Sequence, residues 1–208
     1  MGKIHLAEES FPATPSAGFG RGWFDSSNNQ WYQKNDAGIY LGDQSGAITS
    51  AIGSHSANTY YKGLQLPSFA MQAGSVFEWY FPVTKTAGTA GPVYTIVFGP
   101  NQSTADTVRL TITGPAQTAV ADTGFVRVMV TCRSVGAAGV IQGMVWLQHN
   151  LAATGLANTP AGFSLVEGTS AGFDNQAGTI AGQYIGLCVN PGASAAWVVN
   201  QCLARAWY

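Results

Sequence analysis

The residues with the clearest potential for chemistry are Gly168–Gly172, Gly-Thr-Ser-Ala-Gly, which match the G-x-S-x-G pattern of a serine nucleophile elbow. In that motif a strand-turn-helix geometry raises the serine above a parallel sheet, and an acidic residue and then a histidine follow it along the chain. Here the next residues are loop-like, and all three histidines (His5, His55 and His149) precede Ser170. We therefore interpret this segment as a loop.

Paired carboxylates of the kind that cleave glycans are the second possibility. Glu78 and Glu167 are the only glutamates outside the N-terminal arm, and Glu78 alternates with large aromatics, which predicts an outward-facing strand residue. Asp106 and Asp122 each precede a threonine at a predicted strand start, where side-chain turns account for them. No HxH or HxxxH spacing indicates a metal site. We predict no catalytic, cofactor-binding or metal-binding residue, and hence a protein that is not an enzyme.

The three cysteines, Cys132, Cys188 and Cys202, are far apart and form no CxxC pair. This spacing indicates neither a zinc site nor a redox-active pair. Buried free thiols that act as small hydrophobic residues are favoured, and a disulfide is the alternative.

Charge is scarce in this chain. Only 9% of the residues are charged, against about 25% in an ordinary domain. The nine basic residues are scattered singly, which excludes a nucleic-acid partner, and no apolar run is long enough for a membrane span. The first ten residues lack the apolar region of a signal peptide, so synthesis in a cytosol is expected. A surface this poor in charge suits a protein covered by identical subunits or by a larger assembly. An extracellular β-protein with few charges is the alternative.

Hydrophobic residues recur with a period of two, as in Phe77, Trp79 and Phe81. Similar runs, separated by turns rich in glycine or proline, occupy residues 93–98, 108–112, 125–133, 140–149, 179–189 and 195–206. Roughly eight strands fit between Leu64 and the C-terminus, which predicts a jelly-roll sandwich.

An aromatic passage, Gly18–Leu41, contains strand-like runs separated by two polar turns and predicts a three-stranded meander. Three short strands cannot bury large aromatics by themselves, so another surface must cover them. Because the barrel has enough apolar residues to close on itself, we expect that surface to belong to another protein. The predicted organisation is an arm and meander over 1–42, a linker or first strand over 43–63, and a jelly-roll domain over 64–208.

This N-terminal passage resembles the corresponding segment of tailed-bacteriophage virion proteins. Pro12–Gly18 fits their P-x-x-P-x-x-G entry, Trp31–Lys34 fits an LYxK strand with Trp in place of Leu, and Asn35–Gly38 fits a (D/N)xxG turn. Residues 74–79 through 122–128 are similar to the jelly-roll portion of the same kind of protein. In that family the N-terminal segment attaches to the virion and the β-domain projects, typically as a trimer.

The resemblance implies an all-β fold, with a TNF-like jelly roll after the meander, assembled as a homotrimer. It implies a non-enzymatic virion protein, a capsid decoration protein or head fibre, that is made in the host cytoplasm and contacts phage capsid or tail proteins. The alternative is a tail-associated receptor-binding protein whose barrel recognises a host surface glycan through exposed aromatics. The expected virion-attachment residues are Phe11, Pro12, Pro15, Phe19, Trp23, Phe24, Trp31 and Tyr32. The aromatic C-terminus, Trp207 and Tyr208, is expected at a subunit interface.

Overall fold

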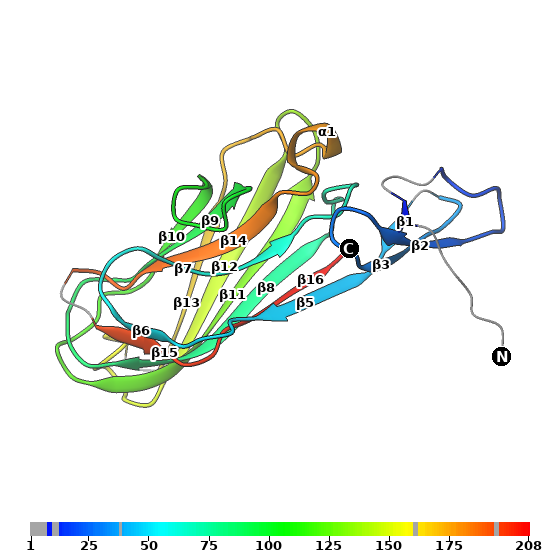
Figure 1. The fold of residues 1–208 in the computed structure, drawn as a ribbon. Coiled ribbons are helices and arrows are strands. Elements are labelled where there is room, and N and C mark those ends of the chain that lie inside the picture. Colours follow the sequence, from blue (N-terminus) through cyan, green and yellow to red (C-terminus); the bar gives the residue numbers. More distant parts are fainter. Residues whose placement is uncertain (1–7, 10–12, 38, 160–161, 194–195) are drawn as a thin grey trace.

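The computed structural model describes residues 8–9, 13–37, 39–159, 162–193 and 196–208 (Figure 1). Within these ranges the chain forms sixteen strands and a single four-residue helix, α1 (Ala177–Ile180). The predicted all-β fold class is therefore confirmed. No helix among the described residues is long and apolar enough to cross a membrane.

Two antiparallel sheets form the body of the molecule. The small sheet has the order β10 (Thr107–Thr113), β9 (Val93–Gly99), β14 (Tyr184–Asn190) and β7 (Thr59–Gln65). The large sheet has the order β13 (Phe163–Thr169), β12 (Val140–His149), β11 (Asp122–Ser134), β8 (Val76–Lys85), β16 (Leu203–Trp207) and β5 (Asp43–Ala47). A short pair, β6 (Ile52–His55) and β15 (Trp197–Val199), extends the large sheet beside one end of β8.

The chain crosses repeatedly between these sheets, from β5 to β7, β7 to β8, β8 to β9, β10 to β11, β13 to β14 and β14 to β16. Four strands in each sheet joined in this way make a jelly-roll sandwich, and the β12–β13 hairpin widens the large sheet at one edge. The predicted jelly roll is confirmed.

The core lies between the two sheets and follows the predicted alternation. In β8, Phe77, Trp79 and Phe81 are buried, as are the alternate valines of β11. Ile96 and Leu187 face them from the small sheet. Successive residues of a strand point to opposite sides of the sheet, so one side of each strand supplies this core.

A separate N-terminal sheet lies at one end of the sandwich, next to the C-terminus (Figure 1). Its strands are β1 (Glu8–Glu9), β2 (Arg21–Asp25), β3 (Trp31–Lys34) and β4 (Tyr40–Leu41). The pairs β2–β3 and β3–β4 are antiparallel and form the predicted meander, and β1 adds to β2 in parallel. Asn29 has φ +56° in the turn after β2, a conformation that asparagine tolerates better than most residues.

The structure departs from the predicted strands in three places. The predicted strand 179–189 begins only at Tyr184, because α1 and a positive-φ turn at Gly182 precede it. The predicted strand 195–206 is divided into β15 and β16, and β13 was not anticipated. Residues 43–63, left open between a linker and a strand, contain β5, β6 and most of β7. Phe11 and Pro12 lie outside the described residues.

The three cysteines are free and buried, as favoured from the sequence. Burial raises the pKa of the thiol to about 11 in Cys132 and to about 12 in Cys188 and Cys202.

We therefore expect the folded protein to be inert toward a thiol reagent such as DTNB at about pH 8, where the thiolate is the reactive form. In guanidinium chloride all three thiols should react. Rapid reaction of any one of them in native buffer would contradict this prediction.

Candidate functional site: two exposed apolar faces

One side of the N-terminal sheet is covered by the chain's own jelly roll. Trp23, Tyr32 and Tyr40 pack against Phe69, from the β7–β8 loop, and against the C-terminal Tyr208. Tyr40 stacks on Phe69 with ring centroids 4.1 Å apart, and Tyr32 contacts Tyr208 at 5.6 Å and Phe69 at 5.1 Å. We call these five residues the docking cluster.

The docking cluster corrects two expectations. Trp23 and Tyr32, predicted to contact another protein, are buried within the chain, because the strand period places them opposite to their neighbours Phe24 and Trp31. Tyr208, predicted at a subunit interface, packs inside the same cluster. The jelly roll therefore both closes on itself and covers one side of the meander.

Polar contacts fix the same junction. The fully buried Asp25 carboxylate accepts hydrogen bonds from the Ser68 backbone N at 3.1 Å, from Ser68 Oγ at 2.5 Å and from the Ser27 backbone N at 2.9 Å. The Gln72 amide exchanges two hydrogen bonds with the Tyr40 backbone, at 2.6 and 3.2 Å. Buried polar groups with several partners hold a single geometry, so the N-terminal sheet has a fixed orientation on the sandwich.

The other side of the N-terminal sheet is exposed and apolar. Phe24 and Trp31 are 39% and 40% exposed and form an edge-to-face pair with centroids 5.3 Å apart. The Trp31 ring lies over Gly22, where a Cβ would come within 2.2 Å of it, so a side chain at position 22 would displace the ring. Together with Leu41 and Gln33, these residues form what we call the N-terminal face, which borders a groove of about 270 Å³.

The remaining predicted attachment residues are less informative. Phe19 is 69% exposed in the segment before β2, and Pro15 is half-buried. Of the predicted set, Phe24 and Trp31 are therefore the ones that the strands hold together on one open surface.

A second exposed apolar surface lies on the outer side of the large sheet. Phe125, Trp146, Phe163 and Leu165 are between 42% and 55% exposed, although each has a large apolar side chain. The strand register places Trp146 directly beside Leu165, and Phe163 two residues further along on the same side. Met144 joins them around a groove of about 300 Å³. We call Phe125, Met129, Met144, Trp146, Phe163 and Leu165 the sheet face.

An ion pair lies on the outer side of the large sheet. The Glu78 carboxylate, on the outward side as predicted, is nevertheless buried and forms an ion pair with Arg127. Glu167 lies three strands away in the same row, which at the usual strand spacing is about 14 Å. That separation exceeds the roughly 5–9.5 Å between the carboxylates of a glycosidase.

A more polar groove adjoins the sheet face. It has a volume of about 280 Å³, and Arg133, Gln142 and Glu167 line it together with Met129 and Met144. Arg133 donates a hydrogen bond to the Gln142 side chain. The groove therefore combines planar polar groups with apolar walls.

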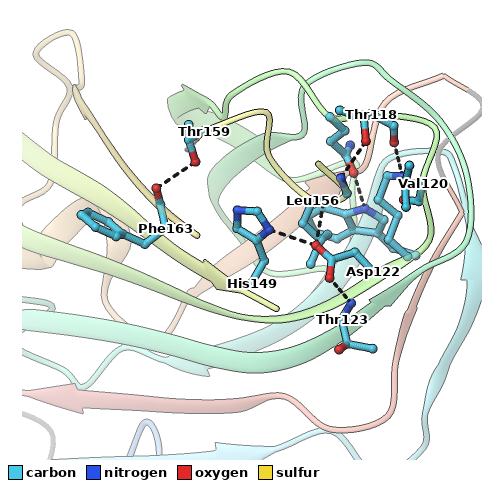
Figure 2. A network of polar contacts seen from close by, with 12 residues as sticks. Thr118, Val120, Asp122, Thr123, His149, Leu156, Thr159 and Phe163 are labelled. Atoms are coloured by element: carbon cyan, nitrogen blue, oxygen red, sulfur yellow. Dashed lines mark hydrogen bonds and ion pairs between the residues drawn. The ribbon is translucent and has the colours of Figure 1, made fainter. Parts of the chain in front are cut away.

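A buried polar network at the end of the sandwich fastens the long loops (Figure 2). Asp122 Oδ2 lies 3.0 Å from His149 Nδ1 and accepts a hydrogen bond from the Leu156 backbone N at 3.1 Å. Lys85 Nζ donates to the carbonyls of Thr118 and Val120 at 2.5 and 3.0 Å. As predicted for a turn residue, Asp122 accepts a hydrogen bond from the Thr123 backbone N. The sequence did not indicate that Asp122 also pairs with His149. These side chains are buried, and their hydrogen bonds hold the loops that contain Thr118, Val120 and Leu156 against the large sheet.

The G-x-S-x-G segment is a loop, as interpreted from the sequence. Ser170 follows β13 and is 9% exposed, and its Oγ accepts a hydrogen bond from the Ile141 backbone N at 3.0 Å. Asp106 likewise accepts bonds from the backbone N of Asn101 and Ser103, as expected for a turn residue. Within the described ranges no group of three or more His, Cys, Asp or Glu side chains could hold a metal ion.

Comparisons with known proteins give little further information. No family model matches the chain, and no curated protein matches it. A lectin from Bauhinia forficata in complex with GalNAc aligns with 95% of this chain and 98% of its own, at 11% identity and a TM-score of 0.20. A chain in the structure of infectious bursal disease virus Gx strain aligns over 79% of this chain and 42% of its own, at 11% identity and a TM-score of 0.17. Scores this low carry no argument about fold or function.

The Asp25 contacts generate a stability prediction. Asp25→Ala leaves the Ser68 donors inside the junction without their acceptor, so we expect the free energy of unfolding to fall by about 2 kcal/mol. Urea unfolding followed by tryptophan fluorescence measures the loss. Asp36→Ala is the matched control, because Asp36 also accepts a backbone hydrogen bond but is exposed. An equal effect of the two substitutions would show that the Asp25 contacts do not hold the junction.

Proposed function

We propose that this protein is a non-enzymatic structural component of a phage particle, a capsid decoration protein or head fibre that attaches through its N-terminal face. The observation that carries the proposal is the exposed Phe24–Trp31 pair on a sheet whose other side is fastened to the sandwich. Contiguous exposed apolar residues mark protein contact sites more often than free surface, and aromatic residues are enriched at such sites.

The position of the N-terminal face supports attachment at one end. The N-terminal sheet lies beyond one end of the sandwich (Figure 1), so a partner bound there leaves the jelly roll projecting. Asp25 and the docking cluster fix the angle between the N-terminal sheet and the jelly roll. Asp25 bonds to Ser68, and the cluster contains Phe69, and both Ser68 and Phe69 are in the β7–β8 loop. In this proposal the partner is a capsid or tail protein, and the protein is made in the host cytoplasm and resides in the virion as a homotrimer.

Substitution tests this proposal more cleanly than deletion of residues 1–41, because deletion would uncover Phe69 and Tyr208. We expect Phe24→Ser combined with Trp31→Ser to leave the sandwich folded and to reduce binding to particles by at least about tenfold, which corresponds to ~1.4 kcal/mol. The measurement is cosedimentation of the purified protein with particles of the encoding phage that were assembled without it.

The matched control is Val108→Ser combined with Val120→Ser, since these residues are exposed apolar side chains outside the N-terminal face. The control should bind particles as the wild type does. Undiminished binding of the Phe24/Trp31 variant would overturn the proposed attachment.

A receptor-binding role is the second candidate, and the polar groove favours it. Arg133, Gln142 and Glu167 provide donors and acceptors in the polar groove, and Trp146, which lines the adjoining apolar groove with Met144, exposes a ring for stacking on a sugar. In this alternative the groove stays open and the protein binds a host surface glycan.

The glycan alternative predicts that Glu167→Gln combined with Gln142→Ala abolishes retention on host cell-wall glycan. A pull-down with purified cell walls measures this, and Gln44→Ala on β5 is a polar control away from the groove. Absence of retention of the wild type removes the alternative.

A further inference from the structure

We propose that the sheet face is the surface through which copies of this chain associate. The inference deepens the proposed homotrimer, on which it rests, by assigning the interface to the outer side of β11, β12 and β13. Trp207 of β16, predicted at a subunit interface, is 39% exposed and lies on the outer side of the same sheet.

The strand register concentrates the apolar residues. Across β11, β12 and β13 one row contains Met129, Met144 and Glu167, and the next contains Arg127, Trp146 and Leu165. A third row contains Phe125 and Phe163, separated by Gln148. Met144, Trp146, Phe163 and Leu165 line one groove and so form a contiguous patch, and contiguous exposed apolar residues mark contact sites.

Two of the charges on the outer side of the large sheet have partners. Arg127, in the row of Trp146 and Leu165, pairs with Glu78 of β8. Arg205 of β16 lies over the Tyr80 ring at 5.7 Å. Glu167, exposed in the row of Met129 and Met144, is on the edge strand β13, so it lies at the margin of the sheet face and not at its centre, where desolvation of a lone charge is most costly.

The outer side of the large sheet has the dimensions of a stable interface only when it is taken as a whole. With about 4.8 Å between strands and about seven residues at ~3.3 Å rise, the sheet face on β11, β12 and β13 covers roughly 330 Å², and all six strands from β13 to β5 cover roughly 700 Å². Stable protein interfaces bury about 800 Å² on each partner, so the association has to extend from the sheet face over β8 and β16 to Trp207.

Charge matching favours a second copy over a different protein. The sheet face offers no excess of either sign to attract a strongly charged partner, and it suits a surface that is equally poor in charge. This chain has such a surface, with 9% charged residues and a formal net charge of −1. Association would also cover the polar groove, because Met129 and Met144 line both surfaces. Self-association and glycan binding in that groove therefore exclude one another.

The test is the mass of the full-length protein in solution, measured by light scattering or sedimentation at micromolar concentration. We expect the wild type at a multiple of 21.7 kDa. Trp146→Thr combined with Leu165→Thr, which keeps strand propensity, should shift the mass to that of one chain. Val108→Thr combined with Val120→Thr is the control of equal exposure outside the sheet face, and it should remain associated.

A wild-type mass near 21.7 kDa would overturn the inference, as would a folded Trp146/Leu165 variant that remains associated. Near-UV circular dichroism verifies folding, and Leu165→Thr alone replaces the double variant if the latter does not fold. The proposed attachment through the N-terminal face is tested independently of this inference. A wild type that is monomeric but binds particles retains the attachment and loses this inference, whereas one that associates but does not bind particles does the reverse.

Discussion

The strict alternation of side chains along a β-strand is the constraint on which the rest of this structure depends. Where only every second residue is large and apolar, as over Arg109–Thr113 in β10, one side of the strand fills the core and the other carries polar groups. Where two large residues are adjacent, both cannot enter the core. Trp23–Phe24 and Trp31–Tyr32 therefore each place one ring inside the junction and one in solvent. The adjacent pairs Val145–Trp146 and Trp146–Leu147 do the same in β12, where Trp146 points outward. Both exposed apolar faces arise in this way.

The docking cluster makes the two ends of the chain interdependent. Tyr208, the last residue, packs against Tyr32 from the N-terminal sheet and against Phe69, and its backbone N donates to the Gly42 carbonyl at 3.1 Å. The N-terminal sheet is too small to be stable alone, and the jelly roll supplies the surface that it needs. The docking cluster covers one side of the described strands β2, β3 and β4. Of these strands, only the N-terminal face is therefore available to a partner.

The sequence was sufficient for the fold class, the meander and the long alternating strands, because a period of two is a local signal. It was insufficient wherever the outcome depended on residues far apart. Asp122 and His149 are 27 residues apart and meet only through the β11–β12 pairing, so a turn residue was all that the local pattern could indicate. In β13, apolar residues occur on both sides, at Phe163, Leu165 and Val166, which hides the alternation. Which side of the meander the jelly roll covers depends on Phe69 and Tyr208, and neither is near Trp23 in the chain.

The use of charge links the fold to assembly. Of the nineteen charged residues, at least six are buried in internal contacts: Asp25, Lys34, Glu78, Lys85, Asp106 and Asp122. Some of the few charged side chains therefore hold loops and the N-terminal junction in place, which leaves fewer charged side chains on the surface. A chain with few surface charges and two apolar faces gains solubility when those faces are covered. Attachment through the N-terminal face and association through the sheet face would cover one each. Since the faces lie on different sheets, the two contacts do not compete, and one copy can make both.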